Sequence, residues 1–139
     1  MKIKNFAMLA AAAGMLAACH SSSKITEPAD LNDQRVFFAF NSSEVTEEGR
    51  DNLLGQALYM KNHGDVKIQI AGNCDERGST EYNLALGARR ANAAKAVIVK
   101  DGVDAKRIST ISYGKERPLV QGTGESVWKW NRNATTTVK

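Results

Sequence analysis

The fold is decided by one stretch of the chain, residues 72–91, which reads GNCDERGSTEYNLALGARRA. Just before it, residues 66–70 alternate between apolar and polar side chains, a pattern typical of a strand with one buried face. Residues 72–78 form a charged loop between two glycines, and Ser79 or Thr80 can then cap a helix that runs to about Lys100. A strand that leads through a loop into a long helix predicts a crossover to another strand of a partly parallel sheet.

Three more segments have the character of strands. Residues 36–40 place Val36, Phe38 and Phe40 on one face, and residues 108–113 and 134–138 follow later in the chain. A polar, poorly patterned stretch separates the last two. With residues 66–70, these segments predict a mixed sheet with helices packed on it, which is a two-layer α+β domain over residues 35–139.

Two helices are predicted to cover that sheet. The first begins after Thr46 and ends at His63-Gly64, with Glu47 and Glu48 suited to its positive end. The expected inward seams are Leu54, Leu58 and Lys61 in the first helix and Leu84, Ala88, Ala91, Lys95 and Ile98 in the second.

The first nineteen residues predict a secreted, lipid-anchored protein. Lys2 and Lys4 precede thirteen apolar residues and glycines at 6–18, too short a run to span a bilayer comfortably but typical of a signal peptide. The run ends in Leu16-Ala17-Ala18-Cys19, which looks like a bacterial lipobox, so residues 1–18 would be removed and Cys19 lipidated. An ordinary signal peptide that is cleaved near a cysteine by chance is the alternative. His20 stands where inner-membrane lipoproteins often carry Asp, so resemblance to that sorting rule favours the outer membrane.

The segment that follows is polar, and we predict that residues 19–34 form a lipidated, flexible tether. Two of the 19 basic residues lie in the signal peptide, and the remaining 17 nearly balance the 15 acidic residues. This balance gives no case for a nucleic-acid partner. Cys74 is the only other cysteine, so once Cys19 is lipidated we expect it to be an unpaired, half-buried and inert thiol.

Opposite charges flank the start of the second helix. Asp75 lies just before it, and Arg90 lies roughly three turns inside it with a side chain that leans back toward the loop. A carboxylate beside a guanidinium suits a ligand that carries both an ammonium and a carboxylate group. A plain structural ion pair between Asp75 and an arginine is the alternative. Arg89 lies about 100° around the helix from Arg90 and is assigned to a contact that supports the fold.

Several runs of sequence resemble the peptidoglycan-associated lipoprotein (Pal) family of the OmpA C-terminal-like superfamily: CDERG at 74–78, EYN at 81–83, LG at 86–87, RRANA at 89–93, SYGKERP at 112–118 and NR at 131–132. The resemblance covers about residues 35–138 and implies an OmpA-like βαβαβ domain. It implies non-covalent binding of the meso-diaminopimelate stem peptide of peptidoglycan by a lipoprotein of the outer membrane that faces the periplasm. It also implies a role in the Tol–Pal system. Its binding Asp and Arg correspond to Asp75 and Arg90, and further contacts to Asn41, Ser42 and Asn73.

The chain departs from the family pattern near its end. Asn133 replaces the second Arg of a closing Asn-Arg-Arg motif, which puts the packing of the last strand and the surroundings of Arg132 in question. Trp128 and Trp130 lie nearby, and Trp128 is the one expected to be packed. Either could be a partner contact.

Other functions have less support in the sequence. Cys74 beside Asp75 is the only pair that suggests catalysis, but neither histidine is near it in the sequence, so no enzyme, cofactor or metal is expected. An OmpA-like lipoprotein adaptor outside the Tol system remains the alternative, and only residues 112–116 weakly separate the two.

Overall fold

The computed structural model describes residues 24–139, so the predicted signal peptide and the lipidation site at Cys19 lie outside the described residues. The elements in chain order are η1 (Pro28–Leu31), β1 (Arg35–Phe37), α1 (Glu47–Asn62), β2 (Ile68–Asn73), α2 (Thr80–Lys100), η2 (Ala105–Arg107), β3 (Ile108–Gly114), α3 (Glu125–Asn131) and β4 (Asn133–Val138).

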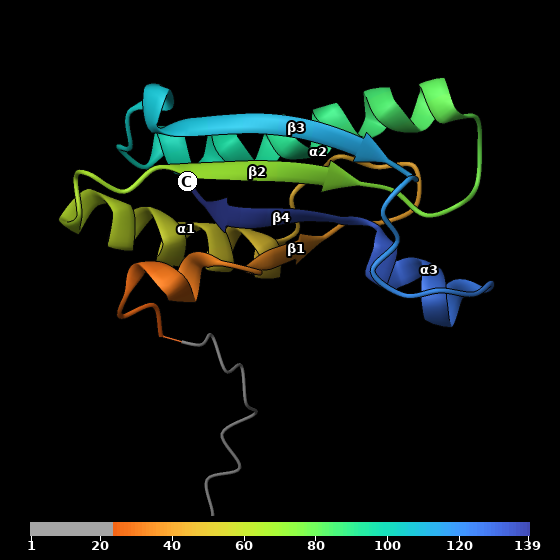
Figure 1. Ribbon diagram of the computed structural model, residues 1–139, viewed down its shortest axis with the longest axis horizontal. Helices are drawn as coiled ribbons and strands as arrows, with labels where there is room; N and C mark the ends of the chain where they lie inside the picture. The colour runs from red at the N-terminus through yellow and green to blue at the C-terminus, as the bar shows by residue number, and fades with distance from the viewer. Residues whose placement is uncertain (1–23) are drawn as a thin grey trace, which may run out of the picture.

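The strands form one mixed sheet in the order β1-β4-β2-β3. β2 and β3 are parallel and are joined by the crossover through α2, whereas β4 lies antiparallel between β1 and β2. Figure 1 shows α1 and α2 lying on the same face of this sheet, with α3 at one end. The predicted two-layer α+β architecture with a mixed sheet is therefore confirmed.

The helix caps follow the prediction, but the buried faces only partly do. Thr46 accepts the backbone N–H of Gly49 at 3.0 Å, and Ser79 is the cap of α2. In α1 the buried side chains include Leu53, Ala57 and Met60, next to the predicted seam; Leu54 is only partly buried, and the prediction that Leu58 faces inward was wrong. Adjacent residues lie 100° apart, and both stripes carry apolar side chains, so periodicity alone could not choose between them.

In α2 the difference between the predicted and the observed buried stripe decides where Arg90 points. Leu84 is exposed, although Ala91 and Ile98 are buried as predicted. The stripe that faces the sheet runs through Leu86 and Arg90, so the arginine points into the protein rather than into solvent.

A close approach of α2 to the sheet places this stripe. A Cβ atom built on Gly72 would lie 1.7 Å from the carbonyl oxygen of Gly87, and one on Gly87 would lie 2.3 Å from Oγ of Ser112. Because neither glycine has a side chain, the helix packs directly on β2 and β3. This contact brings the N-terminal turns of α2 against the end of β2.

Three segments differ from the sequence-based expectations. The folded part begins before residue 35, because η1 packs on the sheet and buries Leu31 completely, so residues 28–34 are not part of a flexible tether. β1 ends at Phe37, and Phe40 is 58% exposed instead of sharing the buried face of Phe38. The polar stretch before β4 contains α3, whose seven residues are too few to show a helical period.

Candidate functional site

The predicted site lies where β2 ends and α2 begins, and the structure brings Asp75 and Arg90 into one small pocket there. Its volume is about 10 Å³, enough for roughly one water molecule. The lining residues are Phe40, Asn41, Cys74, Asp75, Arg77, Tyr82, Asn83, Leu86 and Arg90.

Asp75 is a buried carboxylate with two arginine partners. It is 4% exposed, and Arg77 donates to it from Nε at 3.1 Å, from the terminal nitrogen Nη2 at 2.8 Å and from the backbone at 3.0 Å. Arg132 adds a contact of 3.4 Å. Burial by itself would raise the pKa of Asp75, but the hydrogen bonds and charge of Arg77, with those of Arg132, hold that pKa below its ordinary value. Asp75 is therefore ionised at neutral pH.

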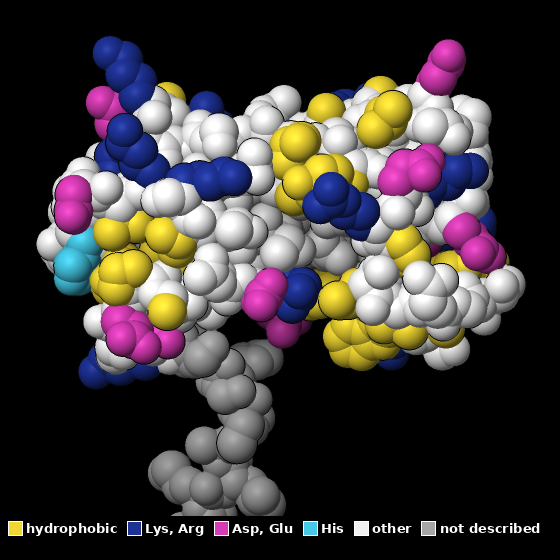
Figure 2. Space-filling model, viewed as in Figure 1, with side chains coloured by type: hydrophobic (Ala, Val, Ile, Leu, Met, Phe, Trp, Pro, Cys, Tyr) yellow, Lys and Arg dark blue, Asp and Glu magenta, His cyan; other side chains and the backbone are white. Residues whose placement is uncertain are grey.

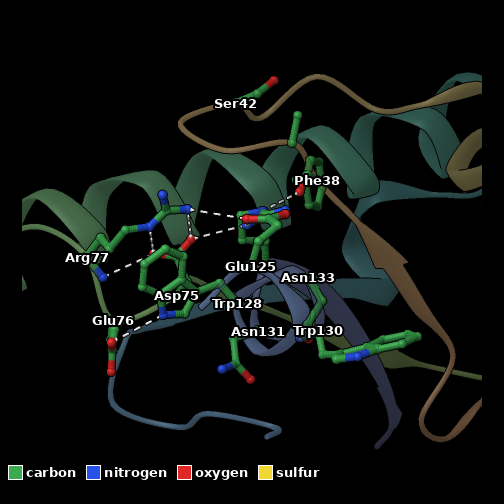
Figure 3. A network of polar contacts seen from close by, with 12 residues as sticks. Phe38, Ser42, Asp75, Glu76, Arg77, Glu125, Trp128, Trp130, Asn131 and Asn133 are labelled. Carbon is green, nitrogen blue, oxygen red and sulfur yellow. Dashed lines mark hydrogen bonds and ion pairs between the residues drawn. The ribbon is translucent and has the colours of Figure 1, made fainter. Parts of the chain in front are cut away.

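Arg77 lines the pocket beside Asp75. Its guanidinium carbon lies 3.8 Å from the ring centroid of Phe40 and 4.0 Å from that of Trp128, so the planar group is held between two aromatic rings. Figure 3 shows Arg77 and Trp128 beside Asp75, with Glu76 accepting the indole N–H of Trp128 at 3.2 Å. The family resemblance did not assign a role to Arg77. Its position two residues after Asp75 is the sequence feature that could have indicated this contact.

Arg90 is 1% exposed and donates hydrogen bonds to three backbone carbonyls. Its guanidinium donates to the carbonyl oxygens of Ser42 at 2.9 Å, Asn73 at 2.9 Å and Ala39 at 3.2 Å. Three of its five N–H groups thus have acceptors among residues 24–139. Arg90 therefore holds the loop after β1 against the end of β2, and it also lines the pocket.

Arg89, by contrast, is exposed. Within residues 24–139 its side chain forms no hydrogen bond or ion pair that meets ordinary geometric limits. The prediction that Arg89 supports the fold was wrong, since it is Arg90 on the next stripe that does so.

Arg132, which follows α3 directly, is the second ion-pair partner of Asp75. Arg132 is buried, donates to the carbonyl of Phe38 at 2.8 Å and binds Glu125 at 2.6 and 3.1 Å. Hydrogen bonds from Arg132 hold the pKa of Glu125 below its ordinary value. Asn131-Arg132 was recognised in the sequence, but Glu125 was missed because nothing local marked α3.

The three other predicted site residues contribute unequally. Asn41 lines the pocket and has a positive φ of 56°, a conformation that asparagine tolerates. Ser42 and Asn73 reach Arg90 through their backbone carbonyls, not through their side chains. The amide of Asn73 instead donates to Oδ1 of Asn133 at 2.9 Å, and its own Oδ1 is buried without a hydrogen-bond partner in the described part of the chain.

The substitution at Asn133 does not disturb the last strand. Its Oδ1 also accepts from Thr135 at 2.9 Å, and its Nδ2 donates to the carbonyl of Trp130 at 2.8 Å. β4 pairs with both of its neighbours from its first residue onward. As predicted, Trp128 is the more packed of the two tryptophans, whereas Trp130 is exposed and meets Phe37 edge-on at 5.5 Å. Figure 2 shows hydrophobic side chains gathered at the end of the molecule where α3 lies.

Cys74 is buried in the same pocket wall, and its thiol donates to the carbonyl of Asn83 at 3.3 Å. Burial raises the pKa of the Cys74 thiol despite the nearby charge of Arg90. A buried thiol with a raised pKa is a poor nucleophile. Over residues 24–139, no cluster of three or more His, Cys, Asp or Glu side chains could hold a metal ion. In the same range, no helix combines the length and the apolar character that a membrane span needs.

Comparison with known proteins shows which family this chain is similar to. The model of the OmpA family matches residues 37–132. The peptidoglycan-associated lipoprotein of Haemophilus influenzae is 37% identical, with 91% of this chain and 92% of that protein aligned. That of Mesorhizobium japonicum is 45% identical over 75% of this chain, but the chain spans only 62% of that protein's length.

Solved structures give the same picture. The crystal structure of the peptidoglycan-associated lipoprotein from Burkholderia pseudomallei has a TM-score of 0.75 and 37% identity, and the match covers 82% of this chain and 95% of that one. The C-terminal domain of Helicobacter pylori MotB has a TM-score of 0.69 at 19% identity over 75% of this chain and 81% of that one, a likeness of fold alone.

Proposed function

The chain belongs to the peptidoglycan-associated lipoproteins of the OmpA family, and from this premise we propose that it binds the stem peptide of peptidoglycan without covalent chemistry. The observation that carries the proposal is the pocket at the end of β2, where an ionised carboxylate and a buried guanidinium lie together. The side chain of meso-diaminopimelate ends in an ammonium and a carboxylate group. Asp75 would take the ammonium, and the remaining N–H groups of Arg90 would take the carboxylate.

The other predicted contacts fit this ligand in different ways. Asn41 lines the pocket and can contact the peptide directly. Ser42 and Asn73 act through their carbonyls, which orient Arg90. The role is binding rather than catalysis, in keeping with a protonated, buried Cys74. Incubation with purified sacculi should therefore sediment the protein and release no soluble fragments.

The sharpest test changes the ligand and leaves the protein intact, because both charged residues also hold the fold. Calorimetric titration with the diaminopimelate stem peptide is compared with the same peptide amidated at the side-chain carboxylate and with a lysine peptide. Loss of one charge-assisted interaction, worth about 1.5–3 kcal/mol, should weaken binding by roughly ten- to a hundred-fold in both cases. Equal affinity for all three peptides would reject this reading of the site.

We place the protein at the outer membrane, facing the periplasm and anchored through Cys19, with a role in the Tol system. The family membership and the Leu16-Ala17-Ala18-Cys19 sequence support this placement. The alternative is an OmpA-like adaptor outside the Tol system. Binding of the purified domain to purified periplasmic Tol proteins separates the two, since an adaptor outside that system would bind none of them.

A further inference from the structure

The pocket is nearly filled by its own side chains. Its volume of about 10 Å³ cannot accept an ammonium and a carboxylate group together. Asp75, its only carboxylate, already has a cation at 2.8 Å. The cation belongs to Arg77, so a ligand ammonium and this guanidinium compete for the same two oxygen atoms.

We propose that Arg77 is an internal competitor at this site, a cation that a ligand ammonium must replace on Asp75. The inference rests on the proposed function, because it concerns the same pocket and the same ligand. It differs from it in assigning to Arg77 a cost that only ligands with an ammonium group meet, because such a ligand must displace this guanidinium from Asp75.

The contacts of Arg77 are those of a replaceable group. Its side chain is 30% exposed, and one of the two rings that hold it belongs to the exposed Phe40. A partly exposed ion pair and cation–π contacts of this kind are each weak. By contrast, Arg90 and Arg132 are almost fully buried and bound to backbone carbonyls, so neither side chain can move away without disrupting the fold.

A second carboxylate, which also binds Arg132, lies within reach of the displaced guanidinium. Glu125 of α3 lies 4.0 Å from Nη2 of Arg77, and its side chain is largely exposed. Arg77 can therefore move from Asp75 to Glu125 while the backbone of the loop keeps its bond to Asp75. A ligand that lacks an ammonium group offers the buried Asp75 no replacement cation, so Arg77 stays on Asp75 when such a ligand binds.

The test is a cycle of two proteins and two ligands, measured by calorimetry. The proteins are the wild type and Arg77→Gln, and the ligands are the diaminopimelate stem peptide and the same peptide with 2-aminopimelate, which keeps the carboxylate but lacks the ammonium. We expect Arg77→Gln to bind the diaminopimelate peptide on the order of ten-fold more tightly, since the competitor is gone. Its affinity for the aminopimelate peptide should be nearly unchanged.

Controls keep the outcome interpretable. Arg89→Gln removes the same charge from an exposed site and should change neither affinity. Near-UV circular dichroism checks the fold, and Arg77→Lys, which keeps the charge without the bidentate geometry, should show a smaller gain if the Gln variant does not fold.

Each other outcome overturns the assignment. Weaker binding of the diaminopimelate peptide by Arg77→Gln would make Arg77 a ligand contact. Equal tightening of both ligands would make it a steric cover with no role at Asp75. Binding of neither ligand by any variant would refute the proposed function itself, and the role of Arg77 with it.

Discussion

Replacement of Arg90 by alanine should destabilise the domain by about 3–5 kcal/mol, whatever it does to ligand binding. The guanidinium donates three hydrogen bonds of 2.9–3.2 Å to the carbonyls of residues 39 and 42 in the loop after β1 and of residue 73 at the end of β2. Each bond from a charged donor contributes about 1.5–3 kcal/mol net, and the three contributions do not add in full because they share one side chain. The residue is 1% exposed, so its removal also leaves a cavity.

Urea denaturation at neutral pH measures this loss. With a slope of about 1.5–2 kcal/mol per molar urea, the midpoint should fall by roughly 2 M. Domains of this size are stable by about 5–15 kcal/mol, so the variant should remain folded in the absence of urea, with a small margin. Any measured loss of peptidoglycan binding must then be read together with the folded fraction.

Arg89→Ala is the matched control, because it removes the same side chain from the adjacent, exposed position of the same helix. Its effect should stay within about 0.5 kcal/mol. A cost below 1 kcal/mol for Arg90→Ala would show that the three carbonyl contacts do not hold the loop after β1, and the role given to Arg90 in the fold would be wrong.

Four further changes probe other parts of the molecule. Because the pKa of Asp75 is lowered in the folded state, its contribution to stability is present above its unfolded pKa, near 3.8, and is lost as pH falls through the folded value. Asp75→Asn should therefore flatten the acid decline in urea titrations that are carried from neutral pH to well below that unfolded pKa. Cys74→Ala should sediment with sacculi like the wild type and cost at most about 2 kcal/mol, and loss of binding by the folded variant would revive a role for the thiol. Gly72→Ala should destabilise the domain by more than about 3 kcal/mol, because its Cβ would lie 1.7 Å from a backbone oxygen. Its control, Gly55→Ala on the open face of α1, should stabilise the domain by about 0.5–1 kcal/mol. Similar thermal midpoints for both variants would contradict this packing. Cys19→Ala should leave the protein soluble in the periplasm or held as a precursor, and an outer-membrane mature form would exclude lipidation at this cysteine.

The sequence determined the elements that local chemistry marks. The alternation at 66–70, the long helical stretch after Ser79 and the caps at Thr46 and Ser79 are properties of neighbouring residues. The structure has the helix and both caps, and it places the strand at 68–73, two residues later at its start and three at its end. The recognisable runs around Asp75 and Arg90 likewise indicated the family without any geometry.

The tertiary structure alone decided which helical stripe is buried, and hence what Arg90 does. The choice between neighbouring stripes depends on the close approach at Gly72 and Gly87, two residues fifteen positions apart whose contact no local pattern encodes. It also decided the partners of Asp75. Arg77 is near in sequence, but Phe40 and Trp128, which hold it in place, come from segments 37 and 51 residues away. Such a site forms only when distant segments pack together. Stacking and ion pairing act over a few ångströms, and their strength depends on the separation of the groups in space, not along the chain.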